Sequence, residues 1–322
     1  MTDNIVAEVA KRLNRADDIA LYCHTNPDGD ALGSMLALYV ALKRKGKTVY
    51  AYCDSAIPPK FQTMFAVENV TFPQKRVHSL AVSVDSSSLD RLGQCMRSFL
   101  SAREQIAIDH HKTFSKFAGL CLVDCLVASC CEVVYSVLKE MKCIDKEVAS
   151  LLFSGIVTDS ACFSFSSVSS KTFDIASSLL AYGIDNGKLV YDYFRAMSAQ
   201  KFKLKSRVMS KAKFYNDNRI AIITIDKSDF AETNTVEEDS EGLINEIINV
   251  DSVQIAYSLA EVGTHRFKVS IRTKGDIDAS EIANVFGGGG HFYASGCRIN
   301  GYKEDIIERL IKIARDRLPY TV

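Results

Sequence analysis

The feature that most constrains the fold is a repeated succession of short apolar runs and helix-length stretches in the first half of the chain. The apolar runs cover residues 19–23, 48–53, 80–84 and 105–108. Helix-like stretches cover residues 33–45, 129–141 and 146–156. Strands that alternate with helices in this way are typical of a parallel sheet whose two faces are both covered by helices. We therefore expect an α/β first domain with helices on both faces of a parallel sheet.

The length of the chain predicts more than one domain, because 322 residues exceed the usual size of a single hydrophobic core. Residues 188–213 form a charged, largely helical stretch, which we interpret as a linker between residues 1–187 and residues 214–322. Beyond it, strand-like runs at 219–225, 253–261 and 265–272 precede a helix that starts at Ser280 and a glycine run. This pattern predicts a smaller second domain of mixed α/β type.

The charge balance excludes one class of function. The chain has 39 basic and 39 acidic residues, so no global positive field holds long nucleic acid. Residues 1–13 are amphipathic and charged, unlike a signal peptide. No apolar run reaches the roughly 18 residues that a membrane span needs. We therefore expect a cytoplasmic protein without a membrane partner, and any nucleotide must be recognised at a local site.

The ten cysteines indicate a reducing compartment rather than a disulfide framework. Cys121, Cys125, Cys130 and Cys131 cluster in the sequence, but they lack the paired CxxC spacing of a structural zinc site. We expect buried free thiols there, because a free cysteine behaves as a small hydrophobic residue.

Acidic and imidazole side chains follow the apolar runs at the points where the predicted strands end. His24 to Asp30 follow the first run, Asp85 follows the third, and Asp109 to His111 follow the fourth. A further acid, Asp159, follows the apolar segment 151–157. Because functional groups collect at the carboxyl ends of parallel strands, we expect these four strand-end segments to converge on one cleft.

The chemistry of this cluster indicates a pair of divalent cations. The turn from His24 through Asp28 to Asp30 offers three ligands, whereas two ions about 3.5–4 Å apart need more, with one carboxylate usually shared. The remaining ligands are Asp85, Asp159 and either His110 or His111. Carboxylates crowded in one pocket repel one another unless cations neutralise them.

The mixture of carboxylate and imidazole ligands suits Mn²⁺ best, with Mg²⁺ or iron as alternatives. A single Asp-Gly-Asp sequence is more often an ordinary surface turn, and a lone histidine pair is more often solvated. The metal interpretation is favoured because four such segments occur in one chain whose predicted strands and helices alternate.

Four segments of the first domain resemble the motifs of the DHH phosphoesterase family. They read His24-Thr-Asn-Pro-Asp-Gly-Asp-Ala-Leu-Gly-Ser, Val84-Asp-Ser-Ser-Ser-Leu-Asp-Arg91, Ile108-Asp-His-His111 and Gly155-Ile-Val-Thr-Asp159. In the second domain, Ile277-Asp-Ala-Ser-Glu-Ile-Ala-Asn-Val-Phe-Gly-Gly-Gly-Gly-His291 with Ala294-Ser-Gly296 resembles the DHHA1 domain. The resemblance covers nearly the whole chain in the order and spacing of the family. It departs at Phe114, where an Asn is frequent, and at Ser160-Ala161, where Thr-Gly is frequent.

The resemblance implies a role for each residue of the cluster. His24 and Asp28 would hold the first metal, and Asp85 would bridge the two ions. The second metal would be held by Asp30, His110 and Asp159. His111 would face the scissile phosphate, and Asp109 would orient the histidines.

The resemblance also implies the substrates and where they bind. The best match is the stand-alone group that hydrolyses short oligoribonucleotides and dinucleotides, such as nanoRNA and pApA, to mononucleotides. The same group converts 3′-phosphoadenosine 5′-phosphate to AMP. Substrate would be bound in the second domain by Arg272, Gly288, Gly289, Gly290 and His291. The oligomeric state is left open, with a second copy of the chain as a candidate partner in a homodimer.

Three other interpretations remain open. A cyclic di-AMP phosphodiesterase of the same family would carry membrane and sensory segments that this sequence lacks. A manganese inorganic pyrophosphatase shares the first-domain motifs but has a different second domain with an Arg-Lys-Lys motif, which is absent here. A nucleotide-binding module without catalysis is disfavoured because every expected ligand position holds Asp or His.

Overall fold

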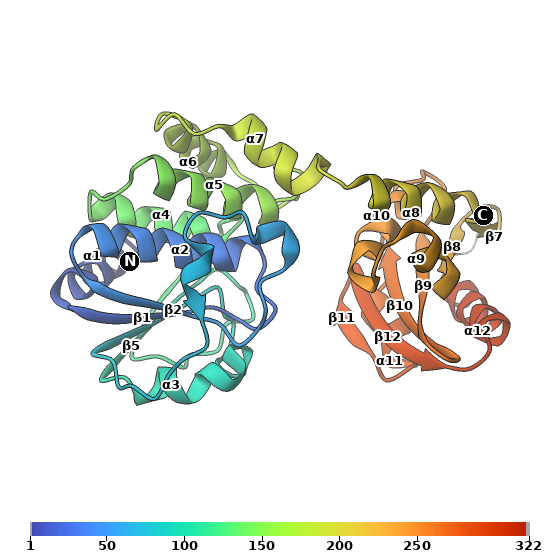
Figure 1. Cartoon of the computed structure of the whole chain (residues 1–322), viewed down its shortest axis with the longest axis horizontal. Coiled ribbons are helices and arrows are strands. Elements are labelled where there is room, and N and C mark those ends of the chain that lie inside the picture. The colour runs from blue at the N-terminus through green and yellow to red at the C-terminus, as the bar shows by residue number, and fades with distance from the viewer. Residues whose placement is uncertain (1, 320–322) are drawn as a thin grey trace. The chain divides into compact units, whose positions relative to one another are not determined.

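A computed structural model describes residues 2–319, which divide into two compact units between Ala196 and Met197 (Figure 1). The predicted linker, residues 188–213, spans this junction. In the first unit it contains most of α7 (Asn186–Val190) and the π-helical turn η4 (Tyr191–Arg195), and in the second it contains α8 (Ala199–Ser210). The boundaries at 187 and 213 stay a prediction.

The first unit contains a sheet of six strands that are all parallel, which confirms the predicted sheet type. In spatial order the strands are β3 (Val70–Thr71), β2 (Thr48–Tyr52), β1 (Asp18–Tyr22), β4 (Leu80–Val84), β5 (Glu104–Asp109) and β6 (Leu120–Val123). The short strands β3 and β6 were not predicted. Strand β3 has only two residues and gives no signal, whereas the four apolar residues of β6 were considered only as part of the cysteine cluster.

Helices cover both faces of this sheet, as predicted, because successive residues of β1 point in opposite directions. Ile19 and Leu21 pack with the helices of one layer, whereas Ala20 and Tyr22 pack against the other side, which includes Phe99. The first layer contains α1 (Thr2–Arg15), α2 (Gly29–Arg44), α4 (Cys130–Glu140), α5 (Lys146–Asp159) and α6 (Ser170–Leu180). The second contains η3 (Leu89–Cys95) and α3 (Met96–Ser101), and Figure 1 shows α3 on the side of the strands away from α2. Two short 3₁₀ turns follow β2, η1 (Pro59–Phe61) and η2 (Val67–Asn69).

The strand order places β1 beside β4, and successive strands are added on one side of this pair (β2, β3) and then on the other (β5, β6). In open parallel sheets, ligands bind outside the carboxyl ends of the strands at such a switch point. Three predicted segments, at His24, Asp85 and Asp109, lie at these strand ends. The fourth does not, because Asp159 is the last residue of helix α5 rather than the end of a strand. The prediction of four strand ends is therefore wrong for that residue.

Close packing of α2 on α5 brings Asp159 to the same place despite its position on a helix. A Cβ atom on Gly33 of α2 would lie 2.6 Å from the carbonyl oxygen of Leu151 on α5. A Cβ atom on Gly155 of α5 would lie 2.9 Å from Oδ1 of Asp30. Gly33 therefore lets the two helix backbones approach, whereas Gly155 leaves room for the side chain of Asp30.

The second unit contains a mixed sheet, which confirms the predicted class. In spatial order its strands are β11 (Gly289–His291), β12 (Ala294–Asn300), β10 (Arg266–Thr273), β9 (Ile255–Gly263), β8 (Ile220–Ile225) and β7 (Lys213–Tyr215). Strands β8 and β9 are parallel, and the other neighbours are antiparallel. The helices α8 and α10 (Leu243–Ile248) pack on one face, and α11 (Ala279–Asn284) and α12 (Lys303–Arg315) pack on the other. The remaining helices are α9 (Lys227–Thr233) and the 3₁₀ turn η5 (Glu237–Ser240).

Within residues 2–319, none of the helices combines the length and the apolar character that crossing a bilayer requires.

Candidate metal centre

The turn after β1 directs His24 and Asp28 toward one point. Asp28 is the N-cap of α2, and its Oδ1 accepts hydrogen bonds of 3.0 Å from the amides of Asp30 and Ala31. This is the usual role of an aspartate at a helix start, and it leaves Oδ2 available. Oδ2 lies 3.9 Å from Nε2 of His24. Nδ1 of His24 is 2.8 Å from the carbonyl of Thr25, so the nitrogen facing the carboxylates is Nε2.

Asp30, in the first turn of α2, is held by the start of another helix. Its side chain is buried, and Oδ2 lies 2.6 Å from the amide of Cys130 while Oδ1 lies 2.9 Å from the amide of Cys131. Both amides belong to the first turn of α4, whose N–H groups have no partner within the helix. The carboxylate of Asp30 is thus oriented by backbone donors.

Asp85 lies between two imidazole rings. It follows β4 with a left-handed backbone (φ 53°), and its amide donates to the carbonyl of Ile108 at 3.0 Å. Its Oδ2 is 3.6 Å from Nε2 of His24, and its Oδ1 is 3.5 Å from Nε2 of His110. The buried Oδ1 makes no hydrogen bond among the described residues. A buried carboxylate oxygen without a donor fits a position where a cation binds.

The two histidines after β5 face different partners. Nε2 of His110 lies 3.5 Å from Oδ2 of Asp159 and 3.8 Å from Oδ2 of Asp30. Nδ1 of His111 instead lies 2.8 Å from Oδ1 of the buried Asp109, and 3.7 Å from Oδ1 of Asp85. Asp109 therefore orients His111, while His110 points into the carboxylate cluster.

The pKa values of the cluster reflect a strongly negative field. Burial lowers the pKa of His24, but its contact with Asp85 outweighs burial and raises the pKa to about 9. The same balance raises the pKa of His110 to about 10. Burial, followed by the charge of Asp85, raises the pKa of Asp159 to about 7. Protons and divalent cations are alternative countercharges for these side chains.

Two other acids of the cluster differ in the direction of their shifts. Burial works to raise the pKa of Asp85, but the imidazoles of His110 and His24 hold it well below its usual range. Burial, and then the charge of Asp85, raise the pKa of Asp30 well above its usual range. Asp85 is therefore the carboxylate most firmly held in its charged form.

The six predicted metal ligands are brought together, in groups of three. Within each group the candidate ligand atoms lie within 4.8 Å of one another. The groups are His24, Asp28 and Asp85; Asp30, His110 and Asp159; and Asp85, His110 and His111. Carboxylate and imidazole donors in this number fit divalent cations. The division of ligands between two ions stays a prediction, as does the role of each residue.

Two features of the site were not predicted. Nη2 of Arg91 lies 3.5 Å from Nδ1 of His24. From the sequence, Arg91 had no role beyond its place as the last residue of a motif. Its position six residues after Asp85 was the one signal that could have identified it. The amides of Cys130 and Cys131 gave no signal at all, because a backbone donor at a helix start does not depend on its side chain.

The predicted substrate-binding residues all belong to the second unit. Arg272 of β10 is paired with Ala294 of β12, and Ala294 is paired with His291 of β11. Arg272 and His291 therefore occupy the same register on either side of β12. A Cβ atom on Gly288 or Gly290 would lie 2.3–2.6 Å from backbone atoms of β12. These two glycines thus allow close contact with β12, and their binding of substrate stays a prediction.

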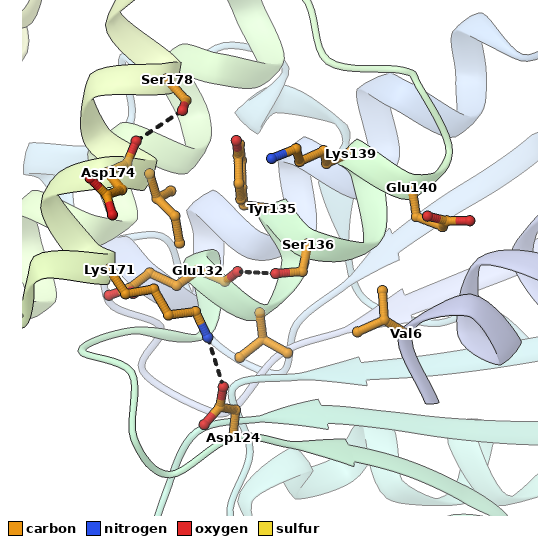
Figure 2. Close-up of a pocket in the computed structure, with 12 residues that line it drawn as sticks. Val6, Asp124, Glu132, Tyr135, Ser136, Lys139, Glu140, Lys171, Asp174 and Ser178 are labelled. Atoms are coloured by element: carbon orange, nitrogen blue, oxygen red, sulfur yellow. Dashed lines mark hydrogen bonds and ion pairs between the residues drawn. The ribbon is translucent and has the colours of Figure 1, made fainter. Parts of the chain in front are cut away.

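A pocket of about 710 Å³ between α4 and α6 contains none of the predicted site residues. Figure 2 shows Lys171 pointing to Asp124 at its edge, where the two form an ion pair of 3.1 Å. The lining carries the cations Lys139 and Lys171 together with four acidic residues. Buried Glu132 in this pocket accepts hydrogen bonds from the amide of Ala128 and from Thr172, so it supports the start of α4. This pocket lies beside the first turn of α4, whose backbone amides bind Asp30.

Comparison with known proteins agrees with this geometry. Residues 18–156 match the DHH family, N-terminal domain, and residues 217–318 match the DHHA1 domain. A Thermus thermophilus protein named bifunctional oligoribonuclease and PAP phosphatase NrnA is 30% identical over 98% of this chain and 94% of its own length. The cyclic-di-AMP phosphodiesterase PdeA of Listeria monocytogenes is 23% identical over 87% of this chain, but only 44% of PdeA is covered.

Among solved structures, an exopolyphosphatase-related protein from Bacteroides fragilis has a TM-score of 0.89 at 27% identity, with 97% of this chain and 96% of that chain covered. The full-length similarity and the two matched domains lead to one conclusion. The chain belongs to the DHH family of phosphoesterases, with a DHH domain followed by a DHHA1 domain.

Proposed function

We propose that this protein hydrolyses short oligoribonucleotides and dinucleotides such as pApA to mononucleotides, and 3′-phosphoadenosine 5′-phosphate to AMP, with two divalent cations. The observation that carries the proposal is the placement of Asp85, with one oxygen toward His24 and the other toward His110. The similarity to the Thermus oligoribonuclease and PAP phosphatase over nearly the whole chain supports the substrate class.

The residues would hold the cations in two groups that share Asp85. One group is His24, Asp28 and Asp85, and the other is Asp30, His110 and Asp159, which Asp85 joins through its contact with His110. When bound, the cations supply Lewis-acid activation of water and offset negative charge on the phosphate. The mixture of carboxylate and imidazole favours Mn²⁺ among the divalent ions.

His111 is suited to contact a phosphate oxygen. Its Nδ1 donates to Asp109, and this hydrogen bond is the main reason why the pKa of His111 is raised. The ring is partly exposed, whereas His110 is turned into the cluster. A protonated His111 therefore presents an N–H group on Nε2 that can donate to the developing negative charge.

Arg91 adds a permanent positive charge beside the cluster. It is exposed, and it forms no ion pair with a carboxylate within the described part of the chain. Its contact with His24 is not a hydrogen bond, because Nδ1 of His24 uses its proton toward Thr25 and both groups are donors. The guanidinium is therefore free to donate to two oxygens of one phosphate group in a bidentate manner.

In the second unit, Arg272 and His291 would bind the nucleotide. Arg272 is half-buried, and burial lowers its pKa. An anionic partner would offset the solvation that its charge loses on burial. The balanced net charge of the chain favours short substrates, because long RNA is held mainly by a broad positive field.

The test is a substrate panel with purified protein in Mn²⁺ or Mg²⁺. The panel contains pApA, a short RNA, 3′-phosphoadenosine 5′-phosphate, cyclic di-AMP and pyrophosphate. We expect mononucleotide release from pApA and short RNA, and its loss in Asp85→Ala. Asp90→Asn is the matched control, because this exposed acid belongs to the same motif but to none of the three ligand groups. Hydrolysis of cyclic di-AMP alone would favour the alternative activity, and no nucleotide hydrolysis at all would overturn the proposal.

A further inference from the structure

A groove on the first unit has a strongly one-sided charge. It lies between the β3–β4 connection and α3, has a volume of about 500 Å³, and is lined by residues 72–77 with Gln94, Arg97, Ser98 and Ser101. We call it the basic groove. Its lining carries three cations and no carboxylate, although the whole chain has equal numbers of acids and bases. The excess positive charge is therefore local.

Two of the three cations have no carboxylate partner. Arg76 is engaged, since its Nη2 lies 3.3 Å from Oδ1 of Asp18 and its guanidinium lies over the ring of Tyr50. Lys75 and Arg97 are exposed, and neither forms an ion pair within residues 2–319. Exposed cations without internal partners are available to an external anion.

The basic groove also presents an aromatic ring. Phe72 is 52% exposed, so its ring is accessible to a ligand. It lines both the basic groove and a neighbouring hollow of about 320 Å³ that contains Cys53, Asp54 and Ser55. A positively charged track with an exposed aromatic side chain is the composition of sites that bind single-stranded nucleic acid.

Hydrogen bonds connect the basic groove to the candidate metal centre. The carboxylate of Asp54 accepts the amide of Gln94 at 2.7 Å, and Gln94 lines the basic groove. The hydroxyl of Ser55 accepts the amide of Asn26 at 2.9 Å, and Asn26 belongs to the turn that carries His24 and Asp28. Gln94 at one end of the basic groove is therefore linked through Asp54 and Ser55 to the turn that supplies two candidate ligands, whereas Arg76 lies near Asp18 at the start of β1.

We propose that the basic groove binds the sugar-phosphate backbone of a single-stranded oligoribonucleotide beyond the nucleotides at the metal centre. Lys75 and Arg97 contact successive phosphates, and Phe72 stacks on a base. This inference rests on the proposed function and adds a binding site for substrates longer than two nucleotides. A dinucleotide is too short to reach it, so the basic groove affects only the longer substrates.

The test compares two substrates in the double variant Lys75→Gln/Arg97→Gln. We expect kcat/KM for a dinucleotide to stay within about twofold, whereas KM for a pentanucleotide rises about tenfold because two charge-assisted contacts are lost. The salt dependence of pentanucleotide binding should weaken by about 1.4 in the slope of log K against log salt, since each phosphate contact on a single strand contributes about 0.7. Phe72→Ala should weaken pentanucleotide binding at least about fivefold through lost stacking.

The matched control is Lys45→Gln/Lys142→Gln, which removes two exposed lysines that lie at the ends of α2 and α4. Binding is measured separately by fluorescence anisotropy with a phosphorothioate pentanucleotide, and thermal unfolding checks that each variant is folded. Equal pentanucleotide binding by the groove variant and the control overturns this inference, while dinucleotide hydrolysis continues. If the unmodified protein does not hydrolyse a dinucleotide, the proposed function is overturned instead. The two failures are therefore distinguishable.

Discussion

Oδ2 of Asp30 accepts a 2.6 Å hydrogen bond from the backbone amide of Cys130, a residue one hundred positions later in the chain. The amide of Cys131 donates to the other oxygen at 2.9 Å. Asp159, in the same candidate ligand group, accepts no hydrogen bond from a backbone amide within the described residues, and its side chain is 30% exposed. Two carboxylates that would hold the same cation are therefore supported in different ways.

This difference predicts opposite effects of two substitutions on stability. Asp30→Asn should lower the free energy of unfolding by about 1–3 kcal/mol, because the new amide group would leave a backbone N–H without an acceptor, and this cost outweighs the gain from removing the buried charge of Asp30. Asp159→Asn should raise stability at pH 8. Because folding raises the pKa of Asp159 from 3.8 to about 7, its ionisation costs stability as the pH rises through that range, and the full cost is present at pH 8. Thermal unfolding with a chelator present measures both, and shifts of the same sign would contradict this account.

Binding of Mn²⁺ should strengthen as the pH rises. The raised pKa values of His24, about 9, and His110, about 10, mean that both side chains hold protons at neutral pH. Asp159, with a pKa of about 7, is partly protonated there. A cation must displace these protons, so its apparent affinity should increase from pH 6 to pH 9 with net proton release. Calorimetry in buffers of different ionisation enthalpy measures the release, and an affinity independent of pH would contradict the prediction.

Arg91→Gln should lower kcat/KM for a dinucleotide about 10- to 100-fold, since a charge-assisted contact to phosphate is lost. The affinity for Mn²⁺ should not change, because Arg91 offers no metal ligand. Arg91→Lys should restore only part of the activity, since an ammonium group cannot form the bidentate contact. Arg97→Gln removes a similar charge from the next helix, α3, and serves as the control. Full activity of Arg91→Gln would show that this arginine does not contact substrate.

Arg272→Gln should raise KM for a dinucleotide about tenfold with a smaller effect on kcat, as expected for a contact in the ground state and the transition state alike. Stabilisation by Mn²⁺ should be the same as in the unmodified protein, because the candidate ligands lie in the first unit. Arg298→Gln is the matched control on the same sheet, where Arg298 is exposed on β12. If both variants raise KM equally, Arg272 has no specific role.

Several elements could be predicted from the sequence because their signals are local. The apolar run 80–84 coincides with β4, and the run that begins at Ile19 overlaps β1 except at its ends. The helix predicted from Gly33 instead begins at Gly29, because Asp28 caps it inside the turn that we had treated as loop. The interpretation of Asp159 as a strand-end residue was wrong, since an apolar segment of that length is compatible with either a buried helix or a strand.

By itself, the sequence determined the parallel α/β class, the mixed second unit and the set of Asp and His side chains available for metal binding. These depend on residue type and on spacing along the chain. Tertiary structure alone decided that Cys130 and Cys131 orient Asp30, that Arg91 lies beside His24, and that Lys75 and Arg97 share a groove without carboxylates. It also decided that the pKa of Asp85 is lowered while that of Asp30 is raised, because burial and the field of neighbouring charges depend on contacts between segments far apart in sequence.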